Sequence, residues 1–195
     1  MKRMTSLYFL KSLSNPKIVF FTNLAKSLPL RNQKLNTFAP KIVNMPFDKL
    51  RPEIETILRN PEEGVDNRLT AVCTLLQETI PYYDWVGFYF RNGDKEELKL
   101  RSFAGEPTDH EIIPFGRGIC GQVAVSNKNF VVPDVKAQDN YIACSIHVKA
   151  EIVVPLFKNG ENIGQIDIDS HTADPFSQED ESFLEWVNEK VAEII

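Results

Sequence analysis

The chain has 195 residues and a formal net charge of −5, and 43% of its residues are hydrophobic and 25% charged, as is ordinary for one globular domain with or without a tail. Its three cysteines exclude a disulfide scaffold, and no paired CxxC spacing indicates a zinc ribbon. No apolar run reaches the roughly 18 residues of a membrane span, and the acidic balance argues against a nucleic-acid partner.

Charge divides the chain into two parts. Residues 1–44 carry eight basic side chains and no acidic one, which leaves 14 basic and 27 acidic residues, a net charge of −13, for residues 45–195. The basic part fits a transit peptide, an arm that binds nucleic acid, or an extension upstream of a true start at Met45. We favour the extension, expect it to be disordered, and assign residues 45–195 to one domain.

Helices are predicted at both ends of this domain. Residues 47–58 and 63–79 have helical periodicity, with Cys73 beside the apolar stripe as a small buried hydrophobe. At the other end, Ser177 is the predicted N-cap of a last helix, with acidic residues in its first turn.

The middle of the domain has the period of β-strands. Residues 85–90 and 97–101 flank an Asn92-Gly93 turn, and residues 151–157 and 162–169 form a second predicted hairpin. Between the hairpins we expect a loop that ends at Gly121, a short helix over 122–125, and a strand over 130–132. The pattern predicts an α+β sandwich, an antiparallel-rich sheet with helices packed on one face.

Side chains that alternate along the strands place a polar group on the other face of the sheet. Asp167 and Asp169 share one face of their strand, and Glu151 lies in the partner strand. Trp85 and Tyr89 share one face of the first strand. Three acids beside an aromatic wall suit a small zwitterion with an ammonium group, although acids that solvate an outer sheet face would give the same alternation.

Two cysteines lie in loops. Cys120 stands at a predicted helix start, where unpaired N–H groups favour a thiolate, and Cys144 precedes the second hairpin. Spacing alone does not decide whether these two cysteines have a redox role or no chemical role.

The segments WVGFYF, IPFGRGICG, VPDV, YIAC, EIVVPLFKNG and GQIDIDS, followed by PFSQEDESFLE, resemble the free methionine-(R)-sulfoxide reductases, which are single GAF domains. The resemblance covers roughly residues 46–195. It implies a small-ligand pocket roofed by loops on the face away from the helices, and a homodimer.

The resemblance also implies roles for individual residues. Cys144 matches the nucleophilic cysteine of the IAC segment, and Cys120 the auxiliary cysteine of the GxCG segment. The residues that match the substrate-binding set, together with the aromatic neighbour from our strand analysis, are Trp85, Tyr89, Glu151, Asp167 and Asp169. The family's third cysteine, usually the resolving one, corresponds to His110 here.

The implied activity is reduction of free methionine-(R)-sulfoxide by cysteine sulfenic-acid chemistry. Either Cys120 or an external thiol, thioredoxin for example, resolves the sulfenic acid. We predict no cofactor and no metal, no nucleic-acid or membrane partner, and a cytoplasmic location unless residues 1–44 are a transit peptide.

Two other functions fit the sequence. A non-catalytic GAF sensor of a small ligand or of redox state would explain the missing cysteine at position 110. A metal site with four ligands, Cys120, His110, Cys144 and His147, would use the CxxH spacing of the last two.

Overall fold

The computed structural model describes residues 47–139 and 146–195. Residues 1–46 and 140–145 lie outside the described residues, so the predicted domain boundary at residue 45 stays a prediction. Cys144 also lies outside the described residues.

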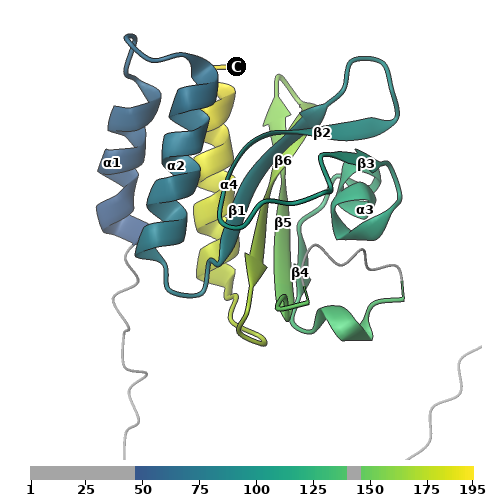
Figure 1. The fold of residues 1–195 in the computed structure, drawn as a ribbon. Coiled ribbons are helices and arrows are strands. Elements are labelled where there is room, and N and C mark those ends of the chain that lie inside the picture. The colour runs from purple at the N-terminus through teal and green to yellow at the C-terminus, as the bar shows by residue number, and fades with distance from the viewer. Residues whose placement is uncertain (1–46, 140–145) are drawn as a thin grey trace, which may run out of the picture. The chain divides into compact units, whose positions relative to one another are not determined.

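Four α-helices and six strands make up the described part of the chain (Figure 1). In chain order they are α1 (Phe47–Leu58), α2 (Val65–Thr79), β1 (Trp85–Arg91), β2 (Glu97–Ala104), β3 (Ile112–Pro114), α3 (Gly118–Ser126), β4 (Phe130–Val132), the 3-10 helix η1 (Val135–Ala137), β5 (Ala150–Lys158), β6 (Glu161–Ser170) and α4 (Gln178–Ala192). None of the helices in this part combines the length and the apolar character needed to cross a bilayer.

The six strands form one sheet in the order β3-β2-β1-β6-β5-β4, and each neighbouring pair is antiparallel. Helices α1, α2 and α4 cover one face, and α3 lies on the opposite face (Figure 1). The predicted α+β sandwich, with an antiparallel sheet and a layer of helices on one face, is therefore confirmed.

The face under α1, α2 and α4 holds the larger apolar core. The even-numbered residues of the central strands point into it, as their alternation predicts. The fully buried apolar members from β1, β5 and β6 are Val86, Phe88, Ala150, Ile152, Val154, Leu156, Ile166 and Ile168.

The last helix begins as its sequence predicts. Ser177 is the N-cap, and its side chain and that of Asp180 form a capping box. Asp180 is fully buried, and its carboxylate also accepts hydrogen bonds of 2.9 Å from the hydroxyls of Tyr82 and Tyr83. The cap therefore also fastens α4 to the segment that leads into β1.

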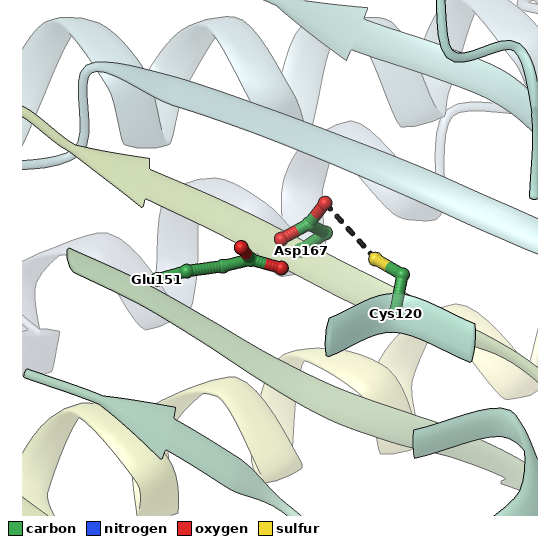
Figure 2. Close-up of side chains that lie close together, drawn as sticks. All are labelled: Cys120, Glu151 and Asp167. Carbon is green, nitrogen blue, oxygen red and sulfur yellow. Dashed lines mark hydrogen bonds between the residues drawn. The ribbon is translucent and has the colours of Figure 1, made fainter. Parts of the chain in front are cut away.

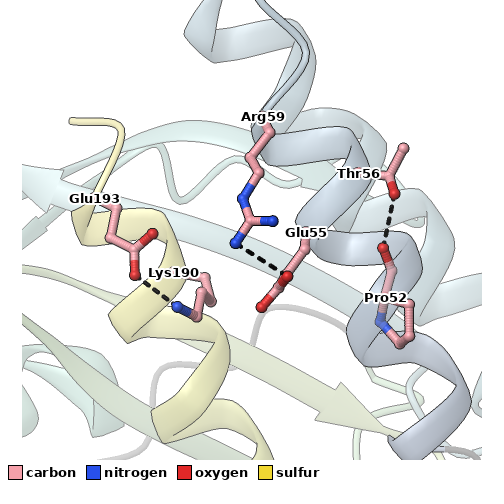
Figure 3. A network of polar contacts seen from close by, with 6 residues as sticks. All are labelled: Pro52, Glu55, Thr56, Arg59, Lys190 and Glu193. Atoms are coloured by element: carbon pink, nitrogen blue, oxygen red, sulfur yellow. Dashed lines mark hydrogen bonds and ion pairs between the residues drawn. The ribbon is translucent and has the colours of Figure 1, made fainter.

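The outer surface of the helical layer carries local polar pairs (Figure 3). Arg59, which follows α1, lies 3.1 Å from Glu55 of that helix, and Lys190 lies 2.6 Å from Glu193 at the end of α4. Exposed pairs of this kind contribute little to stability, because water and salt screen them. They are surface features of the helical side and take no part in the polar face of the sheet.

Two elements differ from the sequence prediction. Strand β3 lies where we expected a loop. The sequence did not reveal it, because an edge strand of three residues is too short to show an alternating pattern. Helix α3 starts at Gly118 and not at Gln122, so that Cys120 is its third residue. Six of the nine residues of α3 are buried, and the exposed residue Val125 is apolar as well, so this helix has no amphipathic period to detect.

Candidate functional site

The polar face of β6 is buried beneath α3. Asp167 and Asp169 are each 2% exposed, and Gln165 on the same face is fully buried. The alternative that these acids solvate an outer sheet face is therefore wrong. Buried carboxylates are costly unless they are paired or neutralised, so this face needs another explanation.

Strand pairing brings the other acid and the aromatic wall to the same place. Asp169 lies directly between Trp85 of β1 and Glu151 of β5, and Asp167 lies opposite Gly87. The three acids predicted from the sequence thus occupy neighbouring positions on two adjacent strands. Glu151 is 4% exposed, so all three are removed from water.

Cys120 approaches these acids from α3 (Figure 2). Its Sγ donates a hydrogen bond of 3.1 Å to Oδ2 of Asp167. Gly121 allows this close packing, because a Cβ there would lie 2.5 Å from the carbonyl oxygen of Pro114 in β3. The N-terminal end of the α3 dipole adds positive potential that favours an anion at this point.

The electrostatics of the cluster favour carboxyl groups that keep a proton near neutral pH. Burial raises the pKa of Asp167 to about 7, against the lowering effect of the hydrogen bond from Cys120. Burial, and next the charge of Asp167, raise the pKa of Glu151 and of Asp169 well above their usual range. The cluster can therefore store and donate protons, as mutual repulsion between buried acids predicts.

Trp85 forms a flat apolar wall beside the acids. A Cβ on Gly87 would lie 2.1 Å from the indole, so the ring lies over this glycine. The indole stacks on Phe103 with ring centroids 5.8 Å apart, and its Nε1 donates to the carbonyl oxygen of Glu106 at 3.0 Å. These two contacts hold the indole in this position.

Tyr89 holds the loop above the site. It is fully buried, and its hydroxyl donates to the carbonyl oxygen of His110 at 2.9 Å. His110 lines a small cavity of about 20 Å³ whose other walls include Cys120, Glu151 and Asp167. The residue that stands in place of the family's third cysteine thus borders the acid cluster.

A second cavity of about 130 Å³ lies on the Asp169 side of the cluster, with Trp85 and Val148 in its walls. Its rim contains Asp84, whose carboxylate lies 3.2 Å from Nδ1 of His171 and accepts the backbone N–H of His171 at 2.7 Å. Our sequence reasoning missed this pair. Asp84 precedes β1 and His171 follows β6, so the register of these two strands was the signal that could have revealed it.

The remaining candidates lie apart from the acid cluster or outside the described residues. The ring of His147 packs against that of His171, with centroids 5.7 Å apart, and the predicted metal set that joins it to Cys144 includes a residue outside the described ranges. Cys73 is fully buried in α2, where burial raises the pKa of its thiol. Its interpretation as a small core residue is confirmed.

Comparison with known proteins gives a consistent result. The sequence model of the GAF domain matches residues 62–195. A GAF domain-containing protein A from Dictyostelium discoideum is 38% identical over 138 residues, which are 71% of this chain and 85% of the relative. The free methionine-R-sulfoxide reductase of Saccharomyces cerevisiae is 39% identical over 154 residues, 73% of this chain and 83% of the relative.

A solved structure adds a similar fold. The free methionine-R-sulfoxide reductase from Neisseria meningitidis, in complex with its substrate, superposes with a TM-score of 0.70 at 34% identity. The match covers 75% of this chain and 86% of that chain.

Proposed function

This chain belongs to the GAF-domain family, and from that premise we propose that it reduces free methionine-(R)-sulfoxide to methionine. Relatives and solved structures named for this activity support the proposal. The observation that carries it is the buried carboxyl of Asp167, whose pKa is raised to about 7 beside Glu151 and the thiol of Cys120. Reduction of a sulfoxide needs such an acid, because the oxygen must be protonated as it leaves sulfur.

The substrate is a zwitterion whose side chain combines a polar sulfoxide with apolar methyl and methylene groups, and the site offers a partner for each part. Carboxylates of the cluster attract the ammonium group. The indole of Trp85 provides a flat surface for the methyl and methylene groups of the substrate side chain. The ammonium group of a bound substrate would supply the partners that these buried carboxyl groups otherwise lack.

The chemical step uses Cys144, which is assigned by resemblance. Its thiolate attacks the sulfoxide sulfur while a carboxylic acid of the cluster protonates the oxygen. The oxygen passes from the substrate sulfur to the sulfur of Cys144, which becomes a sulfenic acid, and methionine leaves.

A second thiol then completes the cycle. It condenses with the sulfenic acid to a disulfide and releases the oxygen as water, and a further thiol reduces that disulfide. Cys120 is the internal candidate for this step, and thioredoxin or another thiol the external reductant. We also propose that the chain acts as a homodimer in the cytoplasm, or in an organelle if residues 1–44 are a transit peptide.

A turnover assay tests the reductase. The purified chain is incubated with free methionine-(R)-sulfoxide and dithiothreitol, and methionine is quantified by chromatography, with the (S)-epimer as the control substrate. We expect methionine from the (R)-epimer alone, and none from Cys144→Ser with any reductant. A Cys144→Ser protein that still reduces the sulfoxide would refute the assigned chemistry.

The alternative is a non-catalytic GAF sensor, which the histidine at position 110 favours because it removes the usual resolving thiol. Dithiothreitol separates the two functions, since it reduces the sulfenic acid directly and makes a resolving cysteine unnecessary. A sensor would bind the sulfoxide or another small ligand, seen by isothermal titration calorimetry, and form no methionine.

A further inference from the structure

Three different side chains at the floor of the small cavity bring their polar atoms together. The thiol of Cys120 and the carboxylates of Glu151 and Asp167 each offer one atom, and these atoms all lie within 4.8 Å of one another. They come from α3, β5 and β6 (Figure 2). Each residue is at least nine-tenths buried, so solvent does not separate them.

One atom of this group has no protein partner. Among the described residues Oδ1 of Asp167 accepts no hydrogen bond, although the side chain is 2% exposed. The carboxyl group of Glu151 points toward Asp167 (Figure 2), and no hydrogen bond joins the two side chains at this oxygen. A buried carboxylate oxygen without a donor is costly, and a cation at this point would satisfy it.

The spacing fits a small divalent ion. For three atoms that are at most 4.8 Å apart, there is always a point that lies within about 2.8 Å of each of them. Zinc bonds are about 2.3 Å to cysteine sulfur and about 2.0–2.2 Å to carboxylate oxygen. Small side-chain rotations therefore bring all three atoms into coordination range.

We propose that Cys120, Glu151 and Asp167 bind one Zn²⁺ ion, and that this ion excludes the sulfoxide substrate from the acid cluster. One thiolate with two carboxylates selects Zn²⁺ over Mg²⁺ or Ca²⁺, which take oxygen ligands alone. Three anionic ligands exceed the charge of the ion by one, and Arg117 lines the same cavity with an opposite charge. A fourth coordination position stays open toward the cavity.

The exclusion of substrate rests on the proposed function, but the binding of zinc does not. Coordination would remove from the cycle the same carboxyl that protonates the sulfoxide oxygen, and the same thiol that is the internal candidate for resolution. Zinc would thus act as a reversible inhibitor of the reductase, released by a chelator.

Spectroscopy of the cobalt form tests the site without an activity assay. The full chain, reduced and freed of metal, is titrated with Co²⁺, which gives a thiolate charge-transfer band when sulfur coordinates it. We expect a band that saturates near one equivalent and that Zn²⁺ abolishes but Mg²⁺ does not. No band from the full chain would overturn the proposal.

Variants identify the sulfur. Cys120→Ser should lose the band, while Cys73→Ser, the matched change of a buried thiol elsewhere, and Cys144→Ser should keep it. A band that survives Cys120→Ser and disappears in Cys144→Ser would overturn the assignment. Asp167→Asn tests the same site in case Cys120→Ser does not fold. This variant should bind Zn²⁺ at least tenfold more weakly in calorimetry, while its thermal unfolding stays cooperative. Unchanged affinity would also overturn the proposal.

Inhibition is measured in a single turnover without dithiothreitol, which itself binds zinc. The reduced, metal-free chain should convert the added methionine-(R)-sulfoxide to methionine in a single turnover. One equivalent of Zn²⁺ should remove at least nine-tenths of this conversion, and a chelator should restore it. Conversion by a chain that binds no zinc overturns the zinc site and leaves the reductase. Zinc binding by a chain that makes no methionine supports the site and refutes the reductase.

Discussion

Replacing Asp167 by asparagine should make the domain more stable at pH 8 and nearly inactive. The carboxyl is 2% exposed, and burial raises its pKa to about 7 from an ordinary value of 3.8. An ionised Asp167 is thus held in the fold at a cost. Asparagine has nearly the same shape, carries no charge, and can accept the hydrogen bond from Cys120 through its carbonyl oxygen.

The magnitude and the pH range follow from linkage. A folded pKa above the unfolded one means that the folded protein binds more protons, so this group lowers the free energy of unfolding as pH rises. The cost is absent below about pH 4, grows between about pH 4 and pH 7, and is complete above pH 7. Each pKa unit corresponds to about 1.4 kcal/mol, which sets an upper value of about 4 kcal/mol for the stabilisation at pH 8.

Denaturant unfolding at pH 4 and at pH 8 measures this effect in the wild type and in Asp167→Asn. The control is Asp48→Asn, since that carboxylate is 94% exposed and should change stability by no more than about 0.5 kcal/mol. Turnover of the sulfoxide should fall by about 10²- to 10⁴-fold in Asp167→Asn, the usual contribution of a general acid. Equal stability of variant and wild type at pH 8 would refute the claim that Asp167 is buried in its charged form at a cost to stability. Unimpaired turnover would refute its role as the general acid.

Three further changes test other parts of the site. Gly87→Ala places a methyl group against the indole of Trp85, so it should cost about 1–3 kcal/mol and raise KM for the sulfoxide; an unchanged KM in steady-state turnover would contradict the aromatic wall. Removal of residues 1–44 should leave the thermal unfolding midpoint within error, whereas a large decrease would mean that the extension packs on the domain. His110→Cys should speed turnover with thioredoxin and leave turnover with dithiothreitol unchanged, and equal rates with thioredoxin would show that thiol resolution does not limit the cycle.

The sheet and its polar face were predictable because both depend on short-range patterns. Alternation in the last hairpin placed Ile166 and Ile168 on one face and Asp167 and Asp169 on the other, as the structure has them. The faces of the central strands follow from the same period of two. The same reasoning placed Glu151 in the partner strand, and resemblance to a known family added Cys120 to the group.

Features that depend on contacts between distant segments could not be predicted in this way. The hydrogen bond from Cys120 to Asp167 joins residues 47 positions apart. The pair of Asp84 and His171 requires the register of β1 against β6. Strand β3 and the first turn of α3 have too few residues, or too uniform a burial, for a period to appear. The place of Cys144 relative to the acids stays a prediction.

The register that assembles the acids is set by a two-residue turn. Strands β5 and β6 join through Asn159 and Gly160, which both have positive φ, 54° and 83°. This is the backbone of the type I′ turn that favours Asn-Gly and matches the twist of a hairpin. From the pair Lys158–Glu161 next to the turn, the ladder runs to Glu151 opposite Asp169, with a register shift between Leu156 and Phe157.

A slip of one residue in β6 would exchange its two faces. The two aspartates would then enter the apolar core under the helices, and the isoleucines would face Cys120. The apolar core on the helical side therefore does more than stabilise the fold. Because the same alternation buries Ile166 and Ile168 there, any register that moves the acids also exposes the core residues to a polar environment, and the hydrophobic effect holds the costly acid cluster in place.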